Sequence, residues 1–104
     1  MRTVNPDISL AGFEDRATEA AQMLRALSNE KRLMILCKLL EHGELSVNEL
    51  IVEVGLSQSA MSQHLARMRE EKIVETRRDA QQIFYRVADP RVGEILRTLK
   101  STFC

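Results

Sequence analysis

The 104-residue sequence has no long apolar run, few cysteines and no excess of charge of either sign. No stretch approaches the roughly 20 apolar residues that a membrane-spanning helix needs. The opening residues MRTVNPDISLAG lack an apolar segment behind a basic start, so no secretory signal is visible and we expect a cytoplasmic protein without membrane contact. The two cysteines, Cys37 and Cys104, are too few for a fold held together by disulfides.

The formal net charge is zero, which argues against nonspecific binding of phosphate by the whole surface. The charges are nevertheless unevenly distributed. Segment 41–53 has four acidic residues and no lysine or arginine, whereas segment 66–86 has six basic residues against four acidic ones. Any phosphate contacts are therefore expected late in the chain.

The sequence also lacks the features of an enzyme. No set of nucleophile, base and orienting group is apparent, and there is no glycine-rich phosphate loop or internal repeat. The apolar content of 44% with 29% charged residues is typical of a folded globular domain. Because residues 1–12 lack periodicity, we predict a flexible arm there and one folded domain over residues 13–104.

Hydrophobic periodicity and capping residues predict five helices, over about 13–27, 29–41, 46–54, 57–71 and from Asp89-Pro90 to the C-terminus. Strands at 73–78 and 82–87, joined by a turn at 79–81, complete a mainly α fold of order ααααββα. The second helix is apolar almost all round, so we expect it to be the most buried element. The first and last helices have apolar stripes that predict a homodimer, unless both stripes pack on the chain's own core.

The segment 44–69, ELSVNELIVEVGLSQSAMSQHLARMR, predicts two short helices joined by a tight turn. Ser46 and Glu49 form a capping box at the start of the first helix, and Gly55 suits the left-handed position after its end. The hairpin that follows the second helix is placed as a wing. This pattern predicts a winged helix-turn-helix that presents its second helix to a DNA groove. Residues 13–104 are therefore expected to form a DNA-binding and dimerisation domain.

The second of these helices is apolar on the face of Met61, Leu65 and Met68 and polar on the opposite face. Gln63 is suited to paired hydrogen bonds with adenine, and Arg67 to guanine or phosphate. The alternative is that this polar face is only solvated. The residues of the helix expected to contact DNA are Ser57, Gln58, Ser59, Ser62, Gln63, His64 and Arg67. For His64 the sequence leaves two roles open, a phosphate contact or a packing contact within the helix-turn-helix.

The predicted wing carries basic and polar side chains at its tip, namely Arg77, Arg78, Gln81 and Gln82. A basic hairpin tip can reach the adjacent minor groove or the DNA backbone. The alternative is that these charges only increase solubility.

The stretches ALSNEKRLMIL, ELSVNEL, LSQSAMSQHLARMR and IFYRV resemble the ArsR/SmtB family of winged helix-turn-helix repressors, over about residues 17–104. The resemblance implies a dimeric bacterial regulator that leaves its operator when an inducer binds. Many members sense metals through a helix that reads ELCVCDL. Ser46 and Asn48 stand where the thiolates would be, and no histidine follows Asp89, so no metal or other cofactor is expected.

Cys37 and Cys104, with the stretch SQSAMSQHLARMR, resemble the thiol-sensing subgroup of this family represented by BigR, SqrR, YgaV and HlyU. The resemblance implies a repressor that binds palindromic DNA when reduced and is released when persulfide or another reactive sulfur species links the two cysteines. By itself, Cys37 is most simply a small buried hydrophobe and Cys104 an exposed terminal thiol. Three alternatives remain open: a direct disulfide under peroxide stress, an anti-silencing activator, and a protein-binding winged helix.

Overall fold

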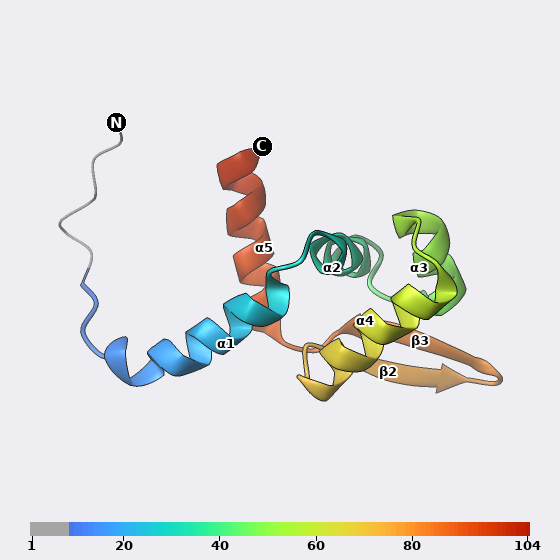
Figure 1. Ribbon diagram of the computed structural model, residues 1–104, viewed down its shortest axis with the longest axis horizontal. Helices are drawn as coiled ribbons and strands as arrows, with labels where there is room; N and C mark the ends of the chain where they lie inside the picture. Colours follow the sequence, from blue (N-terminus) through green and yellow to red (C-terminus); the bar gives the residue numbers. More distant parts are fainter. Residues whose placement is uncertain (1–8) are drawn as a thin grey trace.

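The structure is a computed structural model, and it describes residues 9–104 (Figure 1). Most of the arm expected over residues 1–12 therefore lies outside the described residues. Within residues 9–104 no helix is long and apolar enough to cross a membrane. The elements are, in order, η1 (Glu14–Arg16), α1 (Ala17–Leu27), α2 (Glu30–His42), β1 (Leu45–Ser46), α3 (Val47–Val54), α4 (Gln58–Glu70), β2 (Val74–Asp79), β3 (Gln82–Val87) and α5 (Pro90–Phe103).

Four helices begin at the predicted capping residues, whereas the first helix, expected from residue 13, starts as the 3-10 helix η1 and becomes α-helical only at Ala17. The Asn29 side chain accepts hydrogen bonds from two backbone amides at the start of α2. Both bonds of the capping box form, with the Ser46 hydroxyl 3.2 Å from the Glu49 amide and the Glu49 carboxylate 2.9 Å from the Ser46 amide. Gly55, at φ 85° and ψ 26°, ends α3 in the left-handed conformation that lacks a steric penalty only for glycine. The predicted order of helices and wing is confirmed.

The sheet has one strand more than the sequence predicts. β3 lies between β2 and the two-residue strand β1, and all pairs are antiparallel. Leu45 pairs with Tyr85 and Ser46 with Phe84. A two-residue strand shows no alternation of apolar and polar positions, so the sequence carries no signal for it. β1 joins the wing directly to the residues that start α3.

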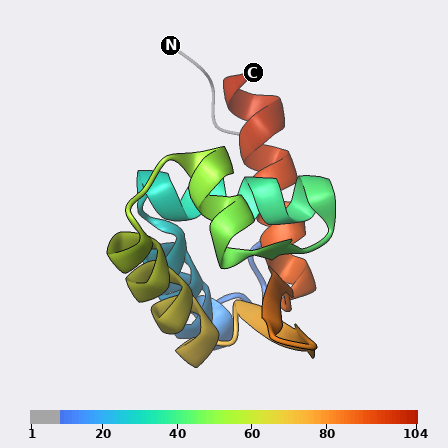
Figure 2. The same ribbon diagram turned by 90° about the vertical axis from the view of Figure 1, so that its right-hand side faces the viewer.

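The core lies between α2, α3, α4, the base of the wing and α5. Figure 2 shows α4 and α5 on opposite sides, with α3 above and the wing below. Side chains from each helix are completely buried there, including Leu36, Leu50, Leu65 and Val92. The core thereby fixes the orientation of α4 relative to the other helices of the chain.

The sequence predicts that α2 is the most buried element, but only one side of it is buried. Ile35, Leu36 and Leu39 are buried, but Met34, Cys37 and Leu40 are exposed. These three positions follow one another at intervals of three residues, so they share one side of the helix. Only the opposite stripe reaches the core, while Leu40 on the outer side lies beside Gly93 of α5.

The apolar stripes of α1 and α5 are also incompletely covered. Leu24 is 59% exposed and Phe103 is 80% exposed, whereas Val92 and Leu96 at the start of α5 are buried. In Figure 1, α1 extends away from the body of the protein, and the end of α5 rises above it. The alternative that both stripes pack fully on the chain's own core is therefore not what one protomer shows.

Candidate nucleic-acid interface

Helix α4 presents the polar face that the sequence predicts. Met61, Leu65 and Met68 are completely buried against the core. The side chains on the other side are exposed, namely Gln58, Ser59, Ser62, Gln63, Ala66 and Arg67. Since all of these belong to one rigid helix, the structure holds their positions fixed relative to one another.

The N-terminus of α4 is favourable for an anion. The Ser57 hydroxyl caps the helix by accepting a hydrogen bond from the Ala60 amide at 3.1 Å, and the first turn has no acidic residue. A helix N-terminus has amide groups without helical partners and carries a partial positive charge. Ser57 thus has a structural role in addition to any contact with DNA, and DNA phosphate suits the end of the helix that it caps.

His64 lies half-buried on the flank of α4 that faces α2. Its Nδ1 accepts a hydrogen bond of 3.3 Å from Nε of Arg32, a residue of the first turn of α2. Burial, and then the nearby positive charge of Arg32, hold the pKa of His64 below its ordinary value, which favours the neutral imidazole. Of the two roles expected for His64, the packing contact is present. Nothing in the sequence indicated that Arg32 would be its partner.

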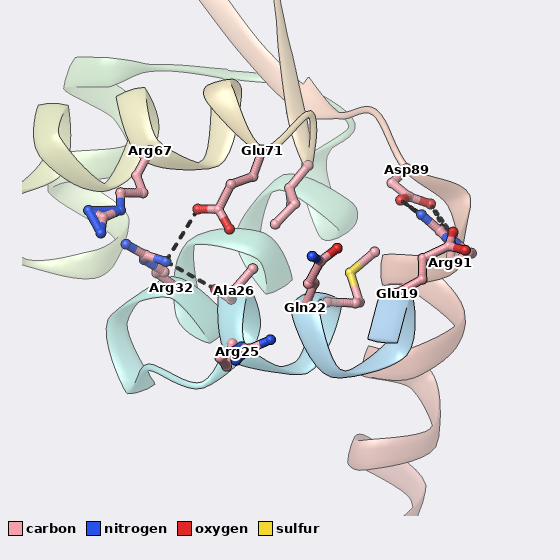
Figure 3. A pocket seen from close by; sticks show the side chains of 11 residues that line it. Glu19, Gln22, Arg25, Ala26, Arg32, Arg67, Glu71, Asp89 and Arg91 are labelled. Atoms are coloured by element: carbon pink, nitrogen blue, oxygen red, sulfur yellow. Dashed lines mark hydrogen bonds and ion pairs between the residues drawn. The ribbon is translucent and has the colours of Figure 1, made fainter. Parts of the chain in front are cut away.

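Arg67 lies on the same flank as His64 and lines a cavity of about 560 Å³ between α1, α4 and the start of α5. Figure 3 shows Arg67 and Arg32 pointing toward one another at one end of this cavity. Arg32 also donates to the Ala26 carbonyl at 3.2 Å and lies 3.9 Å from the Glu71 carboxylate. Arg32 and Arg67 thus lie where α4 meets α1 and α2, with the Glu71 carboxylate beside Arg32.

The two neighbouring arginines of β2, Arg77 and Arg78, have different surroundings. Nε of Arg77 donates to the Glu44 carboxylate at 3.1 Å, and its guanidinium lies 4.9 Å from the centre of the Phe84 ring. Hydrogen bonding from Arg77 lowers the pKa of Glu44. The charge of Arg77 is thus already paired, and the pair ties the wing to the residue before β1. Arg78 and Gln81 are exposed, and within residues 9–104 no ion pair involves Arg78.

Both cysteines are free thiols and exposed. Cys37 lies on the outer side of α2, which contradicts the simple prediction of a buried hydrophobe. Cys104 follows α5, and its amide donates to the Lys100 carbonyl at 2.8 Å. The two helices approach each other at Gly93 of α5, where a Cβ would lie 3.7 Å from the Leu40 side chain. Over the described residues, no group of three or more His, Cys, Asp or Glu side chains is placed to hold a metal ion.

A capped helix-turn-helix with an exposed polar second helix, followed by a hairpin, defines the winged helix-turn-helix class of DNA-binding regulators. The profile described as "Bacterial regulatory protein, arsR family" matches residues 29–76. HTH-type transcriptional regulator YgaV of Escherichia coli (strain K12) is 46% identical over 95 residues, which cover 91% of this chain and 96% of YgaV. The chain belongs to the arsR family of bacterial regulatory proteins.

Two further comparisons agree in fold and class. The crystal structure of the transcriptional repressor BigR from Xylella fastidiosa has a TM-score of 0.87 and 42% identity, covering 93% of this chain and 98% of BigR. Transcriptional activator HlyU of Vibrio cholerae serotype O1 is 42% identical over 97 residues, which cover 93% of this chain and 89% of HlyU. The protein is therefore a DNA-binding transcriptional regulator and not an enzyme, as the sequence predicts.

Proposed function

We propose that the protein is a homodimeric repressor that binds a palindromic operator when its thiols are reduced and releases it when Cys37 and Cys104 become linked. The observation that carries the proposal is the exposure of both thiols on two helices that pack against each other. α2 also contacts the recognition helix through Arg32 and His64. A change at Cys37 therefore acts on the helix that supports α4.

The DNA contacts of this proposal come from α4 and the wing. Ser59, Ser62 and Gln63 face the major groove, and the wing tip with Arg78 and Gln81 reaches the flanking backbone or minor groove. Arg77 holds the wing in place through Glu44. Two copies of α4, related by a two-fold axis, bind half-sites about 34–36 Å apart.

The dimer that this arrangement requires is formed by the uncovered stripes of α1 and α5. The exposed side chains of Phe13, Leu24 and Phe103 supply apolar area for a two-fold interface, in which the same surface of each protomer is used. The cytoplasm is the compartment in which such a regulator meets DNA and in which its thiols stay reduced until an inducer arrives.

The inducer in this proposal is a persulfide, RSSH. Each cysteine thiolate attacks the outer sulfur of one RSSH and releases RSH, which leaves Cys37–SSH and Cys104–SSH. The two protein persulfides then combine to a trisulfide link and release H₂S, so that all sulfur atoms and electrons balance. A peroxide would instead oxidise the two thiols to a direct disulfide and be reduced to two molecules of water.

The link changes the distance between the two recognition helices. Joining Cys104 to Cys37 draws the end of α5 onto α2, and α5 carries part of the dimer surface. A small change in tilt spoils the match of the two α4 helices to their half-sites. A loss of about 3 kcal/mol lowers operator affinity more than a hundredfold, which is enough to release most of the bound protein.

The test compares wild type with Cys37→Ser and Cys104→Ser in operator titrations before and after persulfide treatment. Wild type is expected to lose affinity on treatment, and both variants to keep it. Mass spectrometry separates the inducers, because inserted sulfur adds mass and a direct disulfide removes two hydrogens. Full release of Cys37→Ser by persulfide would contradict the mechanism.

A second candidate is activation by displacement of another DNA-binding protein. It is favoured by the relative HlyU, which is described as a transcriptional activator. Footprinting at a target promoter distinguishes the two modes. A direct repressor protects the promoter itself, whereas an anti-silencer protects a neighbouring site and raises transcription only when the silencing protein is present.

A further inference from the structure

Arg32 occupies the junction of three helices. It lies in the first turn of α2, its Nη1 donates to the Ala26 carbonyl in the last turn of α1, and its Nε donates to Nδ1 of His64 on α4. Its side chain is only 17% exposed. Figure 3 shows the Arg32 side chain between α1 and α4, with dashed lines to Ala26 and Glu71. The position of the Arg32 guanidinium is therefore fixed by contacts with Ala26, His64 and Glu71.

The bond from Arg32 fixes which nitrogen of His64 carries the proton. An arginine side chain has donors and no acceptor. The Nδ1 that accepts from it must be unprotonated, so in the neutral ring the proton is on Nε2. The same positive charge disfavours protonation of the ring, and burial acts in the same direction.

The Nε2–H of His64 is left without a partner within residues 9–104, where no hydrogen bond reaches it. No buried side-chain nitrogen or oxygen in that part lacks a partner, so Nε2 reaches the surface of the protein. It does so on the flank of α4 that also carries Arg67, three residues further along the helix. A DNA backbone that runs beside the recognition helix offers phosphate oxygens as acceptors on such a flank.

We propose that Arg32 is a positioning residue that holds His64 as the Nε2–H tautomer, and that His64 donates this hydrogen to a DNA phosphate as a neutral ring. The inference rests on the proposed binding of DNA through α4. Because Arg32 also bonds the last turn of α1, the contact joins the dimerisation helix to the recognition helix through one side chain.

The charged groups around His64 are Arg32 from α2, Arg67 one turn later on α4, and Glu71 at the end of α4, which approaches Arg32. The pKa of His64 is lowered, so the ring is neutral above its ordinary pKa of 6.5 and stays neutral somewhat below it. The contribution of His64 to DNA affinity is therefore expected to stay constant from pH 8 to 6.5. A contact made by imidazolium would strengthen as the pH falls.

The first test needs no DNA. Long-range ¹⁵N–¹H NMR of the reduced protein at pH 7.5 reports which ring nitrogen of each histidine is protonated, and the His42→Gln variant assigns the two rings. His64 is expected to show a single protonated nitrogen, Nε2, and to become a mixture of both tautomers in Arg32→Met, with Nε2–H still the more abundant. A proton on Nδ1 in wild type would overturn the proposal, whatever the result for operator binding.

The second test measures operator affinity as a function of salt. His64→Phe is expected to lose about tenfold and His64→Gln much less, because the glutamine amide supplies a donor near the position of Nε2. Arg32→Met is expected to weaken binding with an unchanged salt slope, while Arg67→Gln as a control lowers the slope by about 0.9 for a lost phosphate contact. A lower slope in Arg32→Met would make Arg32 a phosphate ligand and overturn its positioning role.

Discussion

The helix-turn-helix is buried by contacts within one chain, whereas helices α1 and α5 leave apolar side chains exposed. We refer to α3 and α4 (residues 47–70) as the reading head, and to α1 and α5 as the arms. In the reading head both helices have side-chain caps, and Leu50, Met61, Leu65 and Met68 are completely buried. In the arms, α1 has no side-chain cap at its start, and Leu24 and Phe103 are mostly exposed.

This difference bears on two separate quantities, the position of α4 within one chain and the distance between two copies of α4. The position of α4 within one chain depends on contacts inside that chain. In the proposed dimer, the distance between the two recognition helices depends on how the arms of the two protomers meet. Cys104 lies at the end of one arm and Cys37 on the support of the reading head. The proposed sensor thus joins the part that is complete to the part that is not.

The largest expected effect is on the completed side of the comparison. Leu65→Ala leaves a cavity at a position with no exposure and is expected to lower the free energy of unfolding by about 2–5 kcal/mol. Val52→Ala is the control, because Val52 lies in the same reading head but is 84% exposed. It should change stability by less than about 0.5 kcal/mol. Denaturant melts at one fixed protein concentration check both variants, and equal losses would contradict the assigned core.

The next effect is on the incomplete side. Leu24→Asp places a charge on the exposed stripe of α1 and is expected to raise the dimer dissociation constant at least tenfold, since a buried unpaired charge is costly. Gln22→Asp adds the same charge about 200° away around the helix and should have little effect. Sedimentation velocity over a range of concentrations measures both. If Gln22→Asp dissociated the dimer and Leu24→Asp did not, another face of α1 would form the interface.

Substitutions at two glycines, one in each region, are expected to change the stability by smaller amounts. Gly55→Ala forces a side chain into the left-handed conformation at φ 85° and is expected to destabilise the protein by about 1–2 kcal/mol. Gly93→Ala adds a methyl group at ordinary contact distance from Leu40 within α5, and is expected to stabilise by about 0.5–1 kcal/mol. Thermal unfolding of the pair gives the signs. A destabilised Gly93→Ala would mean that α2 and α5 pack more closely than 3.7 Å allows.

The smallest effect concerns the ion pairs that fasten α1 to the start of α5. Arg91 lies 2.6 Å from Glu19, and hydrogen bonds from Arg16 and then Arg91 lower the pKa of Glu19 to about 2 from an ordinary 4.5. Because the folded pKa is the lower one, this stabilisation is present above pH 4.5 and is lost as the pH falls toward 2. Glu19→Gln should therefore melt below wild type at pH 7 and together with it near pH 2. A difference that persists at pH 2 would show a cause other than charge.

Much of the fold follows from local signals in the sequence. The capping box of Ser46 and Glu49, the left-handed Gly55 and the Asp89-Pro90 start each act within a few residues, so the pattern alone determines where these helices begin and end. The polar face of α4 follows in the same way, because the period of the helix assigns each side chain to a face. The class of protein and its recognition helix were therefore predictable.

Contacts between residues distant in the chain were decided only by the tertiary structure. Arg32 and His64 are 32 positions apart, and Glu44 and Arg77 are 33 apart, so no local pattern connects them. The exposure of Cys37 was equally hidden, since an apolar helix does not reveal which of its sides meets the core. The sequence by itself determined where the recognition helix lies and what it presents. The packing of the chain decided which side chains orient it, because those partners meet only when distant segments come together.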